Sequence, residues 1–121
     1  MYNQQFGKVG EAIATKYLIS KKFNIIETNF FTKWGEIDIV AERDNRLHFI
    51  EVKTRATLRY GRPEQAVTRS KYQKAKRAVT IYLRQHPEHL QFIYQIDILA
   101  IIYSSYNNQA RVRFFENILL K

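Results

Sequence analysis

The sequence lacks cysteine altogether and has no long apolar run within its 121 residues. Without cysteine, neither disulfide bonds nor thiolate metal sites can form, which is compatible with a reducing cytosol and leaves oxygen atoms as metal ligands. Nowhere are there the roughly 18 uninterrupted apolar residues that a membrane-spanning helix needs, and residues 1–10 lack the apolar run of an export signal. The chain is therefore expected to be soluble and cytoplasmic, without a membrane partner.

Acidic residues are scarce in the segment 53–84, which holds ten Lys or Arg and the single acid Glu64. The rest of the chain carries ten residues of each sign, so this segment accounts for the whole formal net charge of +9. Such a tract favours a polyanion, most commonly nucleic acid, although a merely solvated helix face is the alternative. The side chains expected to contact nucleic acid are Arg55, Arg59, Arg62, Arg69, Lys71, Lys74 and Arg77. Charge alone leaves DNA and RNA both open.

The length suits one domain spanning residues 1–121, and there is no internal repeat. Apolar periodicity predicts a helix over 4–21, strands over 23–31, 36–42 and 46–53, and a helix from Pro63 to about His86, with Thr68 as a second N-cap. Pro87 ends that helix, and strands over 91–102 and 111–115 follow. The second helix can connect two parallel strands by a crossover. This order predicts an α/β protein with a small mixed sheet between helices.

The strands expected over 36–42 and 46–53 should form a hairpin around Asp44-Asn45. An even loop there pairs position 39 with 50, 38 with 51 and 36 with 53, so that Asp38 faces Glu51. Ile37 and Ile39 are expected to share one face of the sheet. Facing carboxylates are destabilising unless a positive charge lies between them, and a divalent metal ion is the obvious candidate.

Magnesium takes one or two protein carboxylates, which Asp38 and Glu51 could provide, together with waters and phosphate oxygens. The carbonyl group of Val52 could add a ligand, and Lys53, on the same face as Glu51, could orient a water or stabilise developing charge. The alternative is a solvated ladder of salt bridges that also includes Glu36. Three acids against one lysine, between apolar strands, favour the metal site.

Three further observations concern residues outside the hairpin. On a helical wheel, Glu11 lies at the edge of the apolar face of the first helix; alone it would be a rim glutamate, but beside the hairpin acids it becomes a candidate. Lys71 shares the inner arc of the second helix, whereas Lys74, Arg77 and Arg84 point outward. Asp97, between two isoleucines, is expected to be a satisfied structural carboxylate.

The arrangement of Glu11, Asp38 and Glu51-Val52-Lys53 resembles the PD-(D/E)XK nuclease superfamily. More closely, the chain resembles the YraN family of small bacterial endonuclease-like proteins, which is related to archaeal Holliday-junction resolvases. The motifs that carry this resemblance are Gly10-Glu11-Ala12, Tyr17-Leu18, Gly35-Glu36-Ile37-Asp38, Glu51-Val52-Lys53-Thr54-Arg55, Gly61-Arg62-Pro63 and Ala66-Val67. The resemblance implies a restriction-endonuclease-like three-layer α/β/α core, dependence on Mg²⁺ or Mn²⁺, branched or structured DNA as substrate, and a homodimer.

When the functional residues of the superfamily are carried over by position, the resemblance implies that Asp38 and Glu51 are metal ligands and that Lys53 is the catalytic lysine. It implies that Glu11 is an auxiliary acid that holds a metal directly or through water. Gln65, Lys71 and Glu36 are further auxiliary candidates. Ile37 stands where the superfamily has its name-giving proline, a difference that removes no ligand. The expected function is a magnesium-dependent endodeoxyribonuclease, and the alternative is a non-catalytic nucleic-acid-binding module on the same scaffold.

Overall fold

A computed structural model describes residues 4–56, 68–104 and 106–118. Its elements, in chain order, are α1 (Gln4–Ser20), β1 (Asn24–Thr32), β2 (Gly35–Arg43), β3 (Arg46–Arg55), α2 (Arg69–Gln85), the short 3₁₀ helix η2 (Pro87–His89), β4 (Ile93–Ser104) and β5 (Gln109–Phe115). The predicted order of helices and strands is confirmed, with boundaries that differ by only a few residues.

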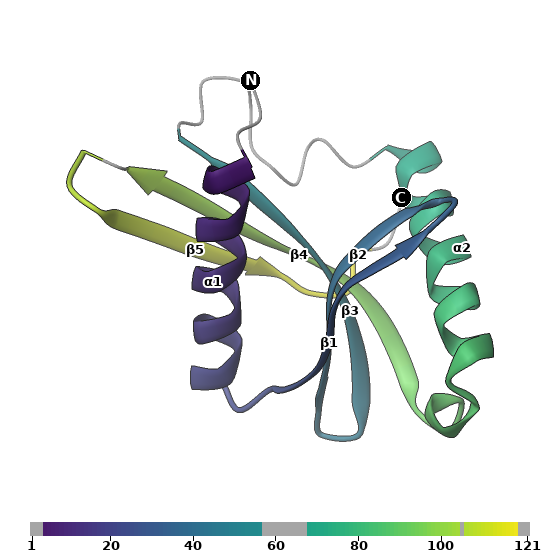
Figure 1. Ribbon diagram of the computed structural model, residues 1–121. Coiled ribbons are helices and arrows are strands. Elements are labelled where there is room, and N and C mark those ends of the chain that lie inside the picture. The colour runs from purple at the N-terminus through teal and green to yellow at the C-terminus, as the bar shows by residue number, and fades with distance from the viewer. Residues whose placement is uncertain (1–3, 57–67, 105, 119–121) are drawn as a thin grey trace.

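The five strands form one mixed sheet in the order β1-β2-β3-β4-β5. β3 and β4 are parallel, as expected for strands joined through a helix, and every other neighbouring pair is antiparallel. Figure 1 shows α1 on one side of the sheet and α2 on the other. The protein therefore has three layers, α/β/α, consistent with a small nuclease-like α/β fold.

Each helix buries an apolar stripe against one face of the sheet. Ala14 and Leu18 of α1 pack in one buried cluster with residues of β2, β3 and β4. Val79 and Tyr82 of α2 pack in a second cluster on the opposite face. Thr68 is the N-cap of α2, as predicted, because its side chain accepts a hydrogen bond from the Lys71 N–H at 3.2 Å. The earlier part of the predicted helix, from Pro63 onward, lies outside the described residues.

The hairpin between β2 and β3 turns at Asp44 and Asn45, whose φ angles of 54° and 60° suit a type I′ turn. Pairing runs from Arg43–Arg46 to Ile39–Ile50, which confirms the predicted register over these residues. The pairing of β2 with β3 ends there, whereas β2 continues to pair with β1 as far as Gly35. The first residues of β2 thus leave β3 at Asp38.

The side chains of β2 also change faces of the sheet at this point. Ile39 packs in the cluster against α1, whereas Ile37 packs in the cluster against α2. The prediction that these two side chains share a face is therefore wrong. Residues two apart share a face only in a regular strand. Here β2 bends away from β3, and Asn29 of the neighbouring β1 adopts a left-handed conformation with φ 55°.

Candidate metal centre

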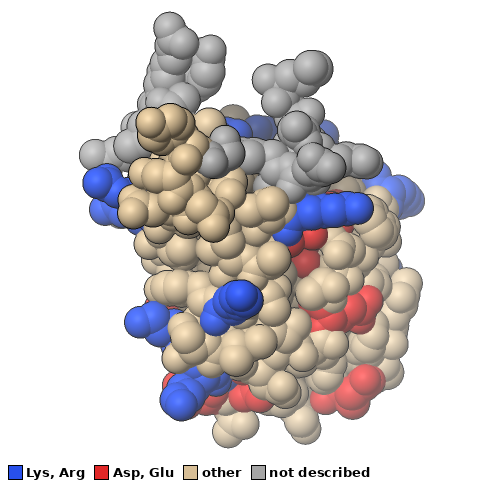
Figure 2. Space-filling model, turned by 60° about the vertical axis from the view of Figure 1, so that its left-hand side comes forward, with Lys and Arg blue, Asp and Glu red and all other residues tan. Residues whose placement is uncertain are grey.

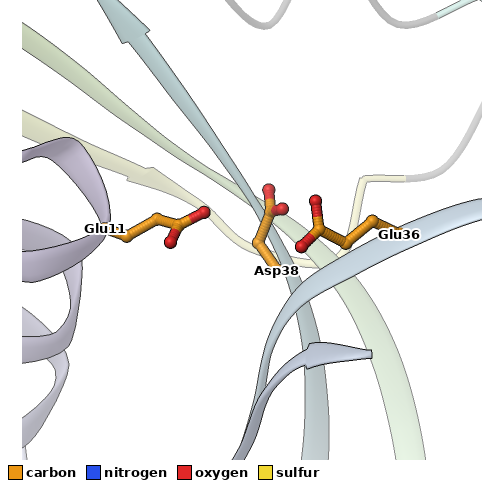
Figure 3. Close-up of side chains that lie close together, drawn as sticks. All are labelled: Glu11, Glu36 and Asp38. Carbon is orange, nitrogen blue, oxygen red and sulfur yellow. The ribbon is translucent and has the colours of Figure 1, made fainter. Parts of the chain in front are cut away.

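Three carboxylates converge where β2 leaves β3. One oxygen from each of Glu11, Glu36 and Asp38 lies within 4.8 Å of the other two. Figure 3 shows Glu11 reaching from α1 and Glu36 from β2, with the Asp38 carboxylate between them. Hard divalent cations prefer carboxylate oxygens, so this acidic trio has the donor set of a magnesium or calcium site.

Glu11 reaches the trio because α1 lies unusually close to β3. Gly10 is buried, and a Cβ atom built on it would lie 1.9 Å from the Thr54 Oγ1 atom. Only glycine fits this contact without a shift of its neighbours. The absence of a side chain at Gly10 thus lets the next residue, Glu11, approach β2.

Asn29 forms hydrogen bonds with two of the three acids. Its Nδ2 atom donates to Glu36 Oε2 at 2.7 Å and to Glu11 Oε2 at 3.3 Å. The neighbouring pairs Thr28–Ile39 and Phe30–Ile37 show that Asn29 lies across from Asp38. Sequence reasoning missed Asn29, although a second hairpin turn centred between residues 33 and 34 would have placed it there.

Asp38 is the acid with the most perturbed ionisation. Burial, and to a lesser degree the charges of Glu36, Glu51 and Glu11, raise its pKa from 3.8 to about 7. A hydrogen bond from the Val52 N–H to Asp38 Oδ2, at 2.8 Å, acts in the opposite direction. A bound cation would offset the repulsion among these acids and favour the ionised carboxylate.

Glu51 lies outside the acidic trio. Its side chain is 48% exposed, and Oε1 is 3.2 Å from Lys53 Nζ. Within the described residues, the acid that joins Asp38 and Glu11 is Glu36, which sequence reasoning had ranked only as auxiliary. The reason is that the pairing of β2 with β3 ends at Ile39, so that Asp38 does not lie in the ladder opposite Glu51, whereas Glu36 lies two residues from Asp38 on the same strand.

Two hollows flank the acidic trio. The first, about 240 Å³, is lined by Lys8, Glu11, Asn29 and Asp38. The second, about 250 Å³, lies between the sheet and α2, and Glu36, Glu51 and Lys53 line it. Lys71 lines the second hollow as well, in agreement with its predicted place on the inner arc of α2. The candidate centre thus opens toward both helices.

The basic residues lie unevenly around this centre. Lys74, Arg77 and Arg84 are exposed on α2, as predicted, together with Arg69. Arg55 is half-buried at the end of β3, and Arg59, Arg62 and Gln65 fall outside the described residues. On the side of the molecule that carries α1, Lys and Arg are scattered among acids rather than gathered (Figure 2). The predicted basic surface is therefore best sought along α2.

Asp97 is the other buried acid, and it is structural as expected. The side chain is fully buried, with Oδ2 2.6 Å from His48 Nδ1, and Oδ1 accepts hydrogen bonds from Gln95 Nε2 and the Asn117 N–H. All its acceptor capacity is directed at these partners. Asp97 therefore takes no part in the acidic trio.

No helix in the described ranges is long and apolar enough to cross a membrane. The sequence model of the uncharacterised protein family UPF0102 matches residues 10–101. These residues include Glu11, Glu36, Asp38, Glu51 and Lys53.

Curated relatives match over most of their own length. A UPF0102 protein of Syntrophomonas wolfei is 41% identical over 100 residues, which cover 83% of this chain and 86% of that one. One from Clostridium botulinum is 36% identical over 115 residues, covering 95% and 94% of the two chains. One from Caldicellulosiruptor bescii is 32% identical over 114 residues, covering 94% and 96%. The chain therefore belongs to the uncharacterised protein family UPF0102, the YraN family that its sequence motifs resemble.

Proposed function

We propose that this protein is a metal-dependent endonuclease that hydrolyses phosphodiester bonds in branched or otherwise structured DNA. The observation that carries the proposal is the convergence of Glu11, Glu36 and Asp38, together with a half-buried lysine, Lys53, that lines the same hollow as Glu36. Three carboxylates within 4.8 Å leave a strong local excess of negative charge. Magnesium or manganese fits this set of hard oxygen donors.

Each side chain has a role in this proposal. Glu11, Glu36 and Asp38 would hold the metal ion, whose chemistry at this place would be to lower the pKa of a bound water and to offset charge on the scissile phosphate. Glu51 remains a candidate fourth ligand, because its charge already reaches Asp38 and an exposed ion pair such as that with Lys53 is weak. The Lys53 ammonium group can orient the attacking water or stabilise charge that develops on the phosphate.

The proposal is tested by incubating the purified protein with linear, flapped and four-way-junction DNA in Mg²⁺ or Mn²⁺. We expect cleavage that is lost in Asp38→Asn and in Lys53→Ala. A matched control is Asp44→Asn, the same chemical change at the exposed turn of the same hairpin, where asparagine also tolerates the left-handed backbone. Absence of cleavage on every substrate, or cleavage that survives Asp38→Asn, contradicts the proposal.

A second candidate is a DNA-binding module without catalysis. It is favoured by Asn29, whose Nδ2 atom donates to both Glu11 and Glu36, and by the raised pKa of Asp38, which eases the repulsion in the trio. Calorimetric titration separates the candidates. If neither Mg²⁺ nor Mn²⁺ binds at millimolar concentration and Asp38→Ala leaves the affinity for DNA unchanged, the module is the better description.

A further inference from the structure

The hollow between the sheet and α2 has apolar walls, which metal binding alone does not require. Its walls include the buried aromatic and aliphatic side chains Phe49, Ala78, Val79 and Ile96. At about 250 Å³ it is slightly smaller than the cavities that hold drug-sized ligands, roughly 300–1,000 Å³. An apolar cavity of this size suits a ligand with one flat, compact group rather than a ligand with several groups linked in a row.

The rim of the same hollow is positively charged on the side of α2. Lys71 and Lys74 line it there, and Lys53 lines it from β3. Trp34 forms part of the wall, with the Arg77 guanidinium carbon 4.4 Å from the centre of its ring. Apolar walls with cations around the opening are complementary to a nucleotide, whose base is apolar on its faces and whose phosphates are anionic.

The hollow is continuous with the acidic trio. Glu36 belongs to the trio and also lines the hollow, and Glu51 and Lys53 line it as well. DNA whose scissile phosphate lies at the trio therefore presents an adjacent nucleotide to the opening. A base still paired and stacked in a duplex cannot enter a closed cavity, whereas an unpaired base can be turned into one at little cost.

We propose that this hollow receives the base of an unpaired nucleotide next to the scissile phosphate, so that the preferred substrate is DNA with a bulged or flapped nucleotide rather than fully paired duplex. The inference rests on the proposed function for the position of the scissile phosphate. The base lies among the apolar walls, and Lys71 and Lys74 contact the flanking phosphates.

The test measures binding without cleavage. Wild-type protein in EDTA is titrated with a labelled duplex that carries one unpaired adenine, and with the same duplex without it, at one fixed salt concentration. We expect the bulged duplex to bind at least about fivefold more tightly, because sequestering a base is worth that much or more. Trp34 is the only tryptophan, so its emission reports on the hollow directly and should change only with the bulged duplex.

Ala75→Leu places a larger side chain in the wall of the hollow and should abolish the preference for the bulge. Gln73→Leu is the matched control, an added leucine two residues away on α2 at an exposed position outside the lining, and it should keep the preference. Thermal unfolding verifies that each variant folds. Equal affinities and equal Trp34 emission with the two duplexes overturn the proposal even if Ala75→Leu fails to fold, and so does a preference that persists in folded Ala75→Leu.

The two proposals fail in different ways. If the bulged duplex is preferred in EDTA but no DNA is cleaved in Mg²⁺ or Mn²⁺, the hollow binds a base and the endonuclease proposal is wrong. If DNA is cleaved but the bulged and paired duplexes bind equally in EDTA, the endonuclease proposal stands and the base-binding hollow is wrong.

Discussion

Asp38 lies at the end of the ladder between β2 and β3, where it has both a backbone hydrogen-bond partner and acidic neighbours. Its oxygen accepts the Val52 N–H, which lies just past the last pair of β2 with β3. Burial and three neighbouring acids nevertheless disfavour its charge. Ionisation of a carboxylate held in this way lowers the stability of the metal-free protein, and a bound cation would stabilise the ionised form.

The first prediction concerns the pH dependence of stability. Because the pKa of Asp38 is raised from 3.8 to about 7 by folding, the folded state binds the proton more tightly than the unfolded state. Stability in EDTA should therefore fall as pH rises from about 4 to 7 and level off above that range. Asp38→Asn removes this penalty, so between pH 4.5 and pH 8 it should gain stability relative to wild type by up to about 4 kcal/mol, since the shift is about three pKa units and each unit corresponds to about 1.4 kcal/mol.

Urea unfolding of both proteins at pH 4.5 and pH 8, in EDTA, measures this difference. Asp44→Asn, at the exposed turn, should show no such pH-dependent gain. Addition of Mg²⁺ at pH 8 should stabilise wild type and not Asp38→Asn, because a ligand that binds only the folded state raises stability. A difference between Asp38→Asn and wild type that is the same at both pH values would show that the raised pKa is wrong.

At the scale of elements, the site depends on how closely α1 approaches the sheet. The contact between Gly10 and Thr54 brings the start of α1 against the end of β3, and Glu11 reaches the acids of β2 from there. On the other face, α2 packs Val79 and Tyr82 against the sheet and forms one wall of the hollow. The site is thus assembled from one helix and one bent strand, with the second helix beside it.

The second prediction follows from that contact. Intrinsic helix propensity favours alanine over glycine by about 1 kcal/mol, so Gly10→Ala would stabilise a helix that had free space there. Because the added Cβ would lie 1.9 Å from Thr54 Oγ1, we expect the opposite, a loss of stability and weaker Mg²⁺ binding as Glu11 moves away. Chemical unfolding and calorimetric Mg²⁺ titration measure the two effects.

The double variant Gly10→Ala/Thr54→Ala is the control for this contact. It removes the Oγ1 and Cγ2 atoms that the new Cβ would meet and should restore part of both stability and metal affinity. Gain of stability in Gly10→Ala alone would contradict the tight approach of α1 to β3.

At the scale of the whole molecule, the two helices lie on opposite faces of the sheet, and the acidic trio opens toward both. Lys71 and Lys74 of α2 line the hollow on one of these faces. The segment 53–84, which contains most of α2, accounts for the whole net charge of +9. A polyanion drawn by this charge would therefore approach along α2 and reach the acids through the hollow.

The third prediction concerns the salt dependence of DNA binding. Each lysine that contacts a phosphate contributes about one unit to the slope of log affinity against log salt concentration. Lys71→Ala and Lys74→Ala should each weaken binding and reduce that slope by about one. Lys16→Ala, an exposed lysine on α1, is the matched control and should leave the slope unchanged. Anisotropy titrations at several salt concentrations give the slopes; equal slopes in all three variants would contradict an approach along α2.

Local rules in the sequence determined the elements, the hairpin register and the roles of several residues. The Asp44-Asn45 turn, the Thr68 cap and the buried Asp97 follow from backbone preferences and residue pattern, which act over a few residues. Glu11 and Asp38 were both identified as members of one site, and the structure brings them together.

Only the tertiary structure decided which acids complete that site. The predicted register of the hairpin placed Asp38 opposite Glu51, but the pairing of β2 with β3 ends at Ile39, and Glu36 and Glu11 are the acids that lie beside Asp38. Asn29 joins them because β1 pairs with the bent part of β2. A bend at the end of a ladder depends on the packing of both helices and the neighbouring strand, and such long-range contacts leave no periodic pattern in the sequence.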